Sequence, residues 1–330
     1  MSLPTFQGTP VPAFTVHIHQ SVSIRDALAL PNATLFGPEH ASSSIRADTT
    51  RHAVRALSIS KWTNFDFEVL TELYKDMLNQ MVPPPNGAKS GPFHVNIIEE
   101  AKKMFLEHLS PRLEEPIKQG AALLGSQFGH QFPAVVVKPG KSFDKQTPTL
   151  SYVAGNDPDG RTLVVNLCLH ANAWRSSMIS GNKATMARRP LDRLAKYCLL
   201  AHTRYGFLMT TEEIVVVRIR GTVFNTNMSC HVEWQAIPWS AQGPYELTAC
   251  LSIWSLVMLS LDDLRMSGSP PHYLPLPRCL PDPRPLNLWW RCQIPKGFFY
   301  RHPSSGQREA DLPEGSMFED APKDTSSWTS

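Results

Sequence analysis

The first half of the chain contains three segments in which apolar residues recur at helical spacing. From Asp66 to Met81 apolar side chains repeat every three or four residues, and Pro83 to Pro85 end the pattern. A second segment of this kind covers residues 97–109, ending near Pro111, and a weaker one covers 113–128. The sequence therefore predicts three helices before the middle of the chain.

Short apolar runs predict strands in the middle of the chain. The first, at residues 134–137, ends at a Pro-Gly pair, and a second covers 149–153. The third, at 163–169, is almost continuously apolar, which is typical of a strand buried on both faces. Asn156 to Gly160 lie between the last two runs. They resemble the opening of a calcium loop but lack its later ligands, so a simple turn is the preferred interpretation.

A helix, a corner and further strands follow. Apolar spacing predicts a helix over 191–202, and Thr203 to Gly206 form a corner at which Arg204 is expected to fix the entry of the next strand. Strands are predicted at 205–209, 214–219 and 231–237. The segment 245–264 reads as a buried helix that is apolar almost all round. This order of elements indicates a mixed α/β domain.

The two ends of the chain have weaker patterns. Residues 1–60 are rich in Ser, Thr, Pro and Ala, and we expect a poorly structured N-terminal extension there. The α/β domain is predicted over 61–265, with a Pro-rich tail over 266–330. Aromatic residues at 289–290 and 298–300 are expected to pack back onto the domain, and about the last 25 residues are disordered by composition.

Composition and charge exclude several classes of protein. The net charge is +3, which is too small to argue for nucleic-acid binding from bulk electrostatics. A basic run between Lys183 and Lys196 is most simply a solvated helix face. None of the six cysteines forms a CxxC pair, which argues against a disulfide scaffold or a zinc site. The first 21 residues do not read as a signal peptide, and the longest apolar stretch, 247–261, is too short to span a membrane. We therefore expect an intracellular protein, cytoplasmic or nuclear, with no membrane partner.

One part of the chain resembles a known group. The string AKYCLLAHTRYGFLMTTEEIVVVRI within residues 191–219, and Ile237-Pro238-Trp239 followed by GPYELTACLSIWSLVML, are similar to a large group of fungal proteins. The domain of that group is similar to the PD-(D/E)XK, or restriction-endonuclease-like, nucleases. The resemblance covers roughly residues 60–265. It implies an α/β (α+β) fold with a mixed sheet flanked by helices, here with extra N-terminal helices.

The resemblance also implies a site. In active members an Asp begins one strand, and an Asp or Glu lies two residues before a Lys on the next. Two carboxylates hold Mg²⁺, which stabilises charge developing on a phosphate, and the Lys orients the attacking water. In this chain the first element matches Pro133-Ala134, and the second matches Asn182 with Lys183 shifted by one position. Neither Ala134 nor Asn182 carries a carboxylate, so we expect weak metal binding at best.

Two hypotheses follow. The first is a non-catalytic nuclease-like fold without a cofactor, which acts as a binding or accessory protein for a nucleic acid or protein partner. The second is a divergent Mg²⁺-dependent nuclease that uses Lys183, with a carboxylate supplied by Glu99 or Glu100 from the preceding helix. The missing acids at Ala134 and Asn182 favour the first hypothesis.

Overall fold

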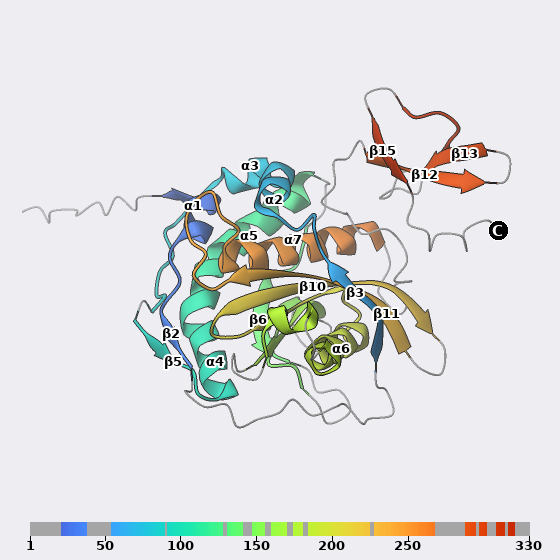
Figure 1. Ribbon diagram of the computed structural model, residues 1–330. Coiled ribbons are helices and arrows are strands. Elements are labelled where there is room, and N and C mark those ends of the chain that lie inside the picture. Colours follow the sequence, from blue (N-terminus) through green and yellow to red (C-terminus); the bar gives the residue numbers. More distant parts are fainter. Residues whose placement is uncertain are drawn as a thin grey trace, which may run out of the picture.

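The computed structural model shows a mixed α/β domain built on a seven-stranded sheet with helices on both faces (Figure 1). It describes residues 21–37, 54–89, 91–127, 131–140, 147–155, 160–169, 174–180, 184–224, 228–267, 288–294, 297–301, 308–313 and 316–320. The strand order is β3 (Arg55–Lys61), β11 (Met228–Pro238), β10 (Glu213–Phe224), β9 (Tyr205–Met209), β8 (Arg161–Cys168), β7 (Leu150–Ala154) and β6 (Val135–Pro139). The pairs β3–β11 and β8–β9 are parallel, and the other neighbours are antiparallel. The predicted mixed sheet flanked by helices is confirmed.

Two hydrophobic cores lie on the opposite faces of this sheet. The helices are α1 (Ile24–Ala29), α2 (Phe67–Leu73), α3 (Lys75–Leu78), α4 (Ile98–Met104), the π-helical turn η1 (Phe105–Leu109), α5 (Ser110–Gln127), the 3-10 helix η2 (Ser176–Ser180), α6 (Ala184–Leu200) and α7 (Ala249–Ser267). Along β10, Ile214 and Val216 face the larger core, and Val215 and Val217 face the smaller one. This alternation follows from the two-residue repeat of a strand. Helices α7 and α5 cover the larger core, and α6 covers the smaller one (Figure 1).

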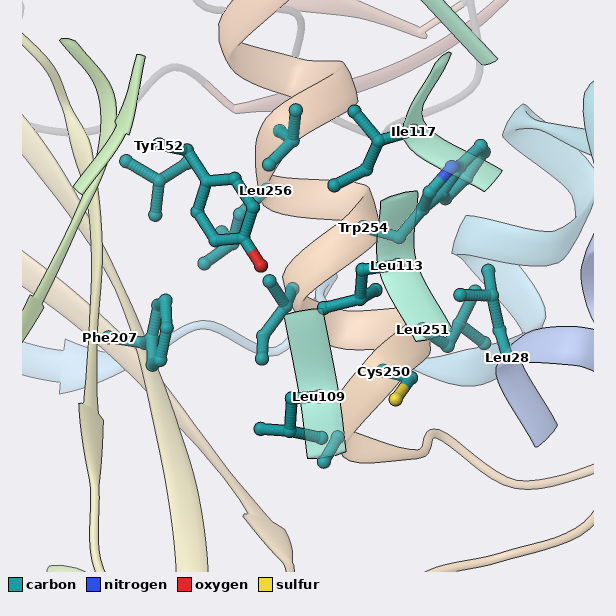
Figure 2. Packing of buried hydrophobic residues seen from close by; sticks show 14 of the residues in the cluster. Leu28, Leu109, Leu113, Ile117, Tyr152, Phe207, Cys250, Leu251, Trp254 and Leu256 are labelled. Carbon is teal, nitrogen blue, oxygen red and sulfur yellow. The ribbon is translucent and has the colours of Figure 1, made fainter. Parts of the chain in front are cut away.

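Helix α7 lies at the centre of the larger core. Figure 2 shows Leu256 on the side of the helix that faces Tyr152 of the sheet, and Trp254 on the opposite side, near Ile117 of α5. The helix begins at Ala249, four residues later than the expected start at 245. The cause is a cap at Thr248, whose hydroxyl oxygen accepts a hydrogen bond from the Leu251 amide at 3.1 Å.

The N-terminal described segment belongs to this core. Ile24 and Leu28 of α1 are completely buried in it, and the carbonyl oxygen of Leu28 accepts a hydrogen bond from the Thr248 hydroxyl at 2.7 Å. Residues 21–37 therefore differ from the poorly structured extension expected over 1–60. Two short strand pairs tie the segment down: β1 (Val22–Ser23) with β4 (Met81–Val82), and β2 (Leu35–Phe36) with β5 (Phe93–His94).

The two helices predicted on either side of Pro111 form one continuous helical rod. Helix α4 passes through η1 directly into α5, so the expected stop near Pro111 does not occur. Proline lacks an amide hydrogen and disturbs the regular hydrogen bonds of a helix interior, and the wider π-helical turn lies directly before Ser110 and Pro111. The single helix predicted over 66–81 is instead divided into two helices, α2 and α3, at Tyr74.

His108 in the π-helical turn η1 is hydrogen-bonded to the N-terminal segment 21–37 through Ala33. Its Nε2 atom accepts a hydrogen bond from the Ala33 amide at 3.0 Å, and its Nδ1 atom lies 2.7 Å from the Lys89 carbonyl oxygen. One nitrogen must accept while the other donates, so the ring is neutral. Burial lowers the pKa of His108, and the nearby Arg112 charge lowers it further against the opposing effect of the Lys89 hydrogen bond.

A pH dependence follows from His108. A lowered folded-state pKa means that the ring contributes its full stability above the ordinary pKa of about 6.5, and that this contribution is lost as the pH falls below it. We expect the His108→Gln variant to lose about 1–3 kcal/mol near neutral pH, because buried hydrogen bonds are disturbed, and to lose less on acidification than the native chain. Urea denaturation at two pH values measures both effects, with the exposed His94→Gln as the matched control. If His108→Gln lost as much free energy of unfolding between the two pH values as the native chain does, this role of His108 would be contradicted.

The corner between α6 and β9 brings helix and sheet into close contact. A Cβ atom at Gly206 would lie 2.9 Å from the Val165 carbonyl oxygen and 3.0 Å from the Cys198 sulfur, so only glycine fits. The carbonyl oxygen of Arg204 accepts a hydrogen bond from the Ile219 amide at 2.8 Å. The Arg204 side chain is buried, in agreement with the role expected for it at the strand entry.

The C-terminal described residues form a separate four-stranded sheet. Its order is β14 (Arg308–Glu309), β13 (Gly297–Arg301), β12 (Leu288–Ile294) and β15 (Met317–Asp320). Trp289 and Trp290 of β12 are buried, but neither belongs to the two cores of the large sheet. Strands β14 and β15 lie within the final residues that we expected to be disordered.

The described cysteines and helices bear on the expected free thiols and on the expected absence of a membrane span. Of their five cysteines, all are free thiols and four are buried; Cys279 lies outside the described part. No helix within the described ranges is long and apolar enough to cross a lipid bilayer.

Candidate functional site

The two glutamates proposed as metal ligands lie in the first turn of α4 and have different surroundings. The carboxylate of Glu100 accepts hydrogen bonds from the amides of Asn96 at 2.6 Å and Ile97 at 3.3 Å, so it caps the helix. The Glu99 side chain is 76% exposed and lies 3.9 Å from the Lys102 amine. Glu100 is therefore occupied by a structural role, whereas Glu99 remains accessible.

The other predicted positions do not form a strand pair in the described part of the structure. Ala134 is exposed and directly precedes β6 at the edge of the sheet. Asn182 and Lys183 lie outside the described residues, so their role stays a prediction. The described elements on either side of them, η2 and α6, are helical, whereas the resemblance expects the second acid and the lysine on a strand.

Polar residues of two neighbouring strands meet at the pair β7–β8. Pro148-Thr149 directly precedes β7, and Asn166 lies two residues before Cys168 on the neighbouring β8. Leu150 pairs with Asn166 across the two strands, which brings the start of β7 beside the end of β8. Thr149, Asn166 and Cys168 thus lie close together at the start of β7 and the end of β8.

Hydrogen bonds connect these three residues, which we call the β7–β8 cluster. The Thr149 amide donates to the Asn166 carbonyl oxygen at 2.9 Å, and the Cys168 amide donates to the Thr149 hydroxyl oxygen at 3.0 Å. The Cys168 thiol donates to the Asn166 side-chain oxygen at 3.2 Å. Asn166 and Cys168 are each only 1% exposed, so the cluster is anchored inside the larger core.

The Cys168 thiol is unreactive at neutral pH. Burial raises its pKa to about 12, opposed by the Thr149 hydrogen bond and reinforced by the Glu99 charge. A thiol rather than a thiolate is therefore present, and it is neither a good nucleophile nor a metal ligand. Glu99, selected from the sequence, lies on α4, and this helix contacts β8, the strand that carries Asn166 and Cys168.

The donor set of the β7–β8 cluster does not fit Mg²⁺. A hydroxyl, an amide and a protonated thiol carry no negative charge, whereas Mg²⁺ binds through carboxylates and water. Among the described residues, no group of three or more His, Cys, Asp or Glu side chains is placed to hold a metal ion. The Asn166 side-chain nitrogen is buried and has no hydrogen-bond partner among the described residues, and it is a donor rather than a ligand atom. We derive no catalytic step through a metal here.

Sequence reasoning missed the β7–β8 cluster although two signals were present. Asn166 is the only polar residue within the apolar run that predicts β8, and Thr149 follows a proline at the start of the strand predicted over 149–153. The earlier Pro133-Ala134 pair was matched to the motif instead, because the pairing of strands was not known. Only the register between β7 and β8 shows that Thr149 and Asn166 are neighbours.

Comparisons of the chain with known protein families, curated proteins and solved structures found no match.

Proposed function

We propose that this chain is a nuclease-like α/β protein that has lost metal-dependent chemistry and acts by binding a nucleic acid or protein partner. The observation that carries the proposal is the β7–β8 cluster. In this proposal Thr149, Asn166 and Cys168 correspond to the two carboxylates and the lysine of the resembled nucleases, and the register that brings the start of β7 beside Asn166 supports this correspondence. Without those charges the site cannot concentrate Mg²⁺ beside a phosphate.

The order of elements supports the nuclease-like part of the proposal. Helix α5, the antiparallel strands β6, β7 and β8, helix α6 and then strand β9 follow one another along the chain. This sequence of a helix, a small sheet, a helix and further strands is the one that the resemblance leads us to expect. The alternative, a divergent Mg²⁺-dependent nuclease, is supported by the accessible carboxylate of Glu99 on α4, a helix that contacts β8.

The first test is calorimetric titration of Mg²⁺ and Mn²⁺ into the purified chain, followed by incubation with labelled DNA. We expect no tight metal binding and no cleavage. Tight binding together with cleavage that is abolished in the Lys183→Ala variant would overturn the proposal. It would establish the divergent nuclease with Lys183 in the role first predicted.

A pair of double variants tests which residues occupy the metal positions. Thr149→Asp with Asn166→Asp places two carboxylates on neighbouring strands, and we expect it to gain measurable Mg²⁺ affinity because two anionic ligands then converge. Ala134→Asp with Asn182→Asp is the matched control at the positions first predicted, and it should gain none. Far-UV circular dichroism checks that both variants fold. Metal binding by the control alone would show that the β7–β8 assignment is wrong.

A further inference from the structure

One face of the small C-terminal sheet carries a group of aromatic side chains. Paired residues of neighbouring strands point to the same side of a sheet, so the register places Tyr300 of β13 and Asp320 of β15 on the same face as Arg291 of β12. The two-residue repeat of a strand adds Phe298 and Phe318 to this face. We call these five residues the aromatic face. None of them belongs to either core of the large sheet, so the aromatic face is distinct from the β7–β8 cluster.

The rings of the aromatic face are in contact with one another, and two of them are exposed. The ring centres of Phe298 and Phe318 each lie 5.6 Å from that of Tyr300, and both contacts are edge-on. Tyr300 is buried, whereas Phe298 is 49% exposed and Phe318 is 43% exposed. Because both exposed rings contact the same tyrosine, their centres are at most twice this distance apart. Exposed apolar groups that gather in this way are typical of an interaction surface.

Arg291 fixes the positions of the two exposed rings. Its guanidinium carbon lies 4.8 Å from the centre of the Phe318 ring and 5.9 Å from that of the Phe298 ring. Its Nε atom donates to the Asp320 Oδ1 atom at 2.8 Å, and its Nη2 atom lies 2.8 Å from the same oxygen. The rings are therefore positioned before a ligand arrives, which reduces the entropy lost on binding.

The charges on the aromatic face favour a basic ligand. The Asp320 side chain is 73% exposed and contacts Arg291 through Oδ1, so its second oxygen can accept a hydrogen bond from a ligand. The register places Glu309 on the same side, opposite Tyr300. A surface that stacks nucleic-acid bases combines aromatic rings with a positively charged groove. Here the arginine is already paired with a carboxylate, which argues against a phosphate backbone as the partner.

A proline-rich peptide matches both the rings and the charge. Such peptides form a polyproline II helix, which binds to exposed aromatic rings and loses little entropy because it is already extended. This helix repeats every three residues, or about 9 Å, so prolines one turn apart can reach two rings separated in this way.

We propose that the aromatic face binds a proline-rich segment of another protein that contains an arginine. Two prolines one turn apart pack on Phe298 and Phe318, and the arginine of the ligand binds the Asp320 carboxylate. This site does not depend on the assignment of the β7–β8 cluster.

Fluorescence anisotropy with the full chain tests the two rings. The probe is a short labelled peptide with proline at every third position and one arginine, and the control peptide has alanine in place of each proline. We expect the native chain to bind only the proline peptide. Phe298→Ala and Phe318→Ala should each weaken this binding about tenfold, because each removes one of the packing surfaces. Tyr245→Ala removes an exposed aromatic ring outside this face and should leave the affinity unchanged.

A second comparison tests the arginine contact. Asp320→Asn should weaken binding of the proline peptide about two- to fivefold at low salt, and less at high salt, because the contact is exposed. A peptide with glutamine in place of its arginine should bind the native chain more weakly by a similar factor, and Asp320→Asn should not weaken its binding further. The peptide comparison leaves the protein unaltered, so it applies even if a phenylalanine variant does not fold.

Four outcomes would overturn the proposal. The first is that the native chain does not bind the proline peptide, or binds the alanine peptide equally well. The second is an unchanged affinity in both phenylalanine variants. The third is tighter binding of a single-stranded DNA oligonucleotide that is lost in the same variants, which would indicate base stacking. The fourth is binding seen only after the prolines between 270 and 285 are replaced by alanine, which would mean that the chain's own segment occupies the face.

Discussion

Replacing Trp254 by alanine is expected to lower the free energy of unfolding by about 3–5 kcal/mol. The side chain is completely buried at the contact of α7 with α5 (Figure 2). Its indole nitrogen donates to the Pro116 carbonyl oxygen at 2.9 Å, and its ring meets the Tyr74 ring edge-on at 5.2 Å. The alanine variant loses all of these contacts and leaves a cavity between three helices.

Two companion variants separate the causes of this loss. Trp254→Phe keeps most of the apolar volume and removes the hydrogen bond to Pro116, so we expect a cost of about 1–3 kcal/mol. Tyr245→Ala removes an aromatic side chain that is 79% exposed, and it should change stability by less than about 0.5 kcal/mol. Urea denaturation of the four proteins measures the series. Equal stability of Trp254→Ala and Tyr245→Ala would show that the core is not packed around α7.

The sequence predicted the elements whose pattern depends only on local spacing. The apolar run at 163–169 became β8, buried on both faces, and the helix over 191–202 is the second half of α6. The all-round apolar character of the segment at 245–264 correctly predicted that α7 is buried. Each of these segments buries enough apolar surface for its own periodicity to be visible.

Features that depend on partners distant in the sequence were not predictable. Helix α1 has six residues and shows no clear period, and its burial depends on contacts with α5 and α7. In the small sheet β12 pairs with β15, and the pattern within either strand does not predict a partner so distant in the sequence. At the candidate site, the sequence selected Glu99 and the two strands, but not the register that places Thr149 beside Asn166. Local sequence patterns predict single helices and strands, whereas the geometry of a site depends on which strands pair and in which register.

The pair Arg218–Glu233 illustrates the same limit and carries the second large prediction. The two residues face each other across the β10–β11 hairpin, and the Arg218 Nε atom donates to the Glu233 carboxylate at 2.7 Å. The Arg218 side chain is 2% exposed, and its guanidinium lies 4.4 Å from the centre of the Trp62 ring. A buried guanidinium of this kind depends on the carboxylate that balances its charge.

We expect Glu233→Ala to destabilise the protein by about 3–5 kcal/mol, because a charge that has been removed from water then loses this carboxylate. Replacing both partners at once, as Arg218→Met with Glu233→Leu, should cost much less than the two single changes added together, since neither position then carries a charge without its partner. Urea denaturation of the native chain, Arg218→Met, Glu233→Leu and the double variant gives the coupling energy of the pair.

The exposed pair Arg175–Glu212 provides the matched control for this cycle. Its side chains are 46% and 45% exposed, so water already solvates both charges. Glu212→Ala should therefore cost less than about 1 kcal/mol, and less still at high salt. A Glu233→Ala variant no less stable than Glu212→Ala would mean that water reaches Arg218 in solution.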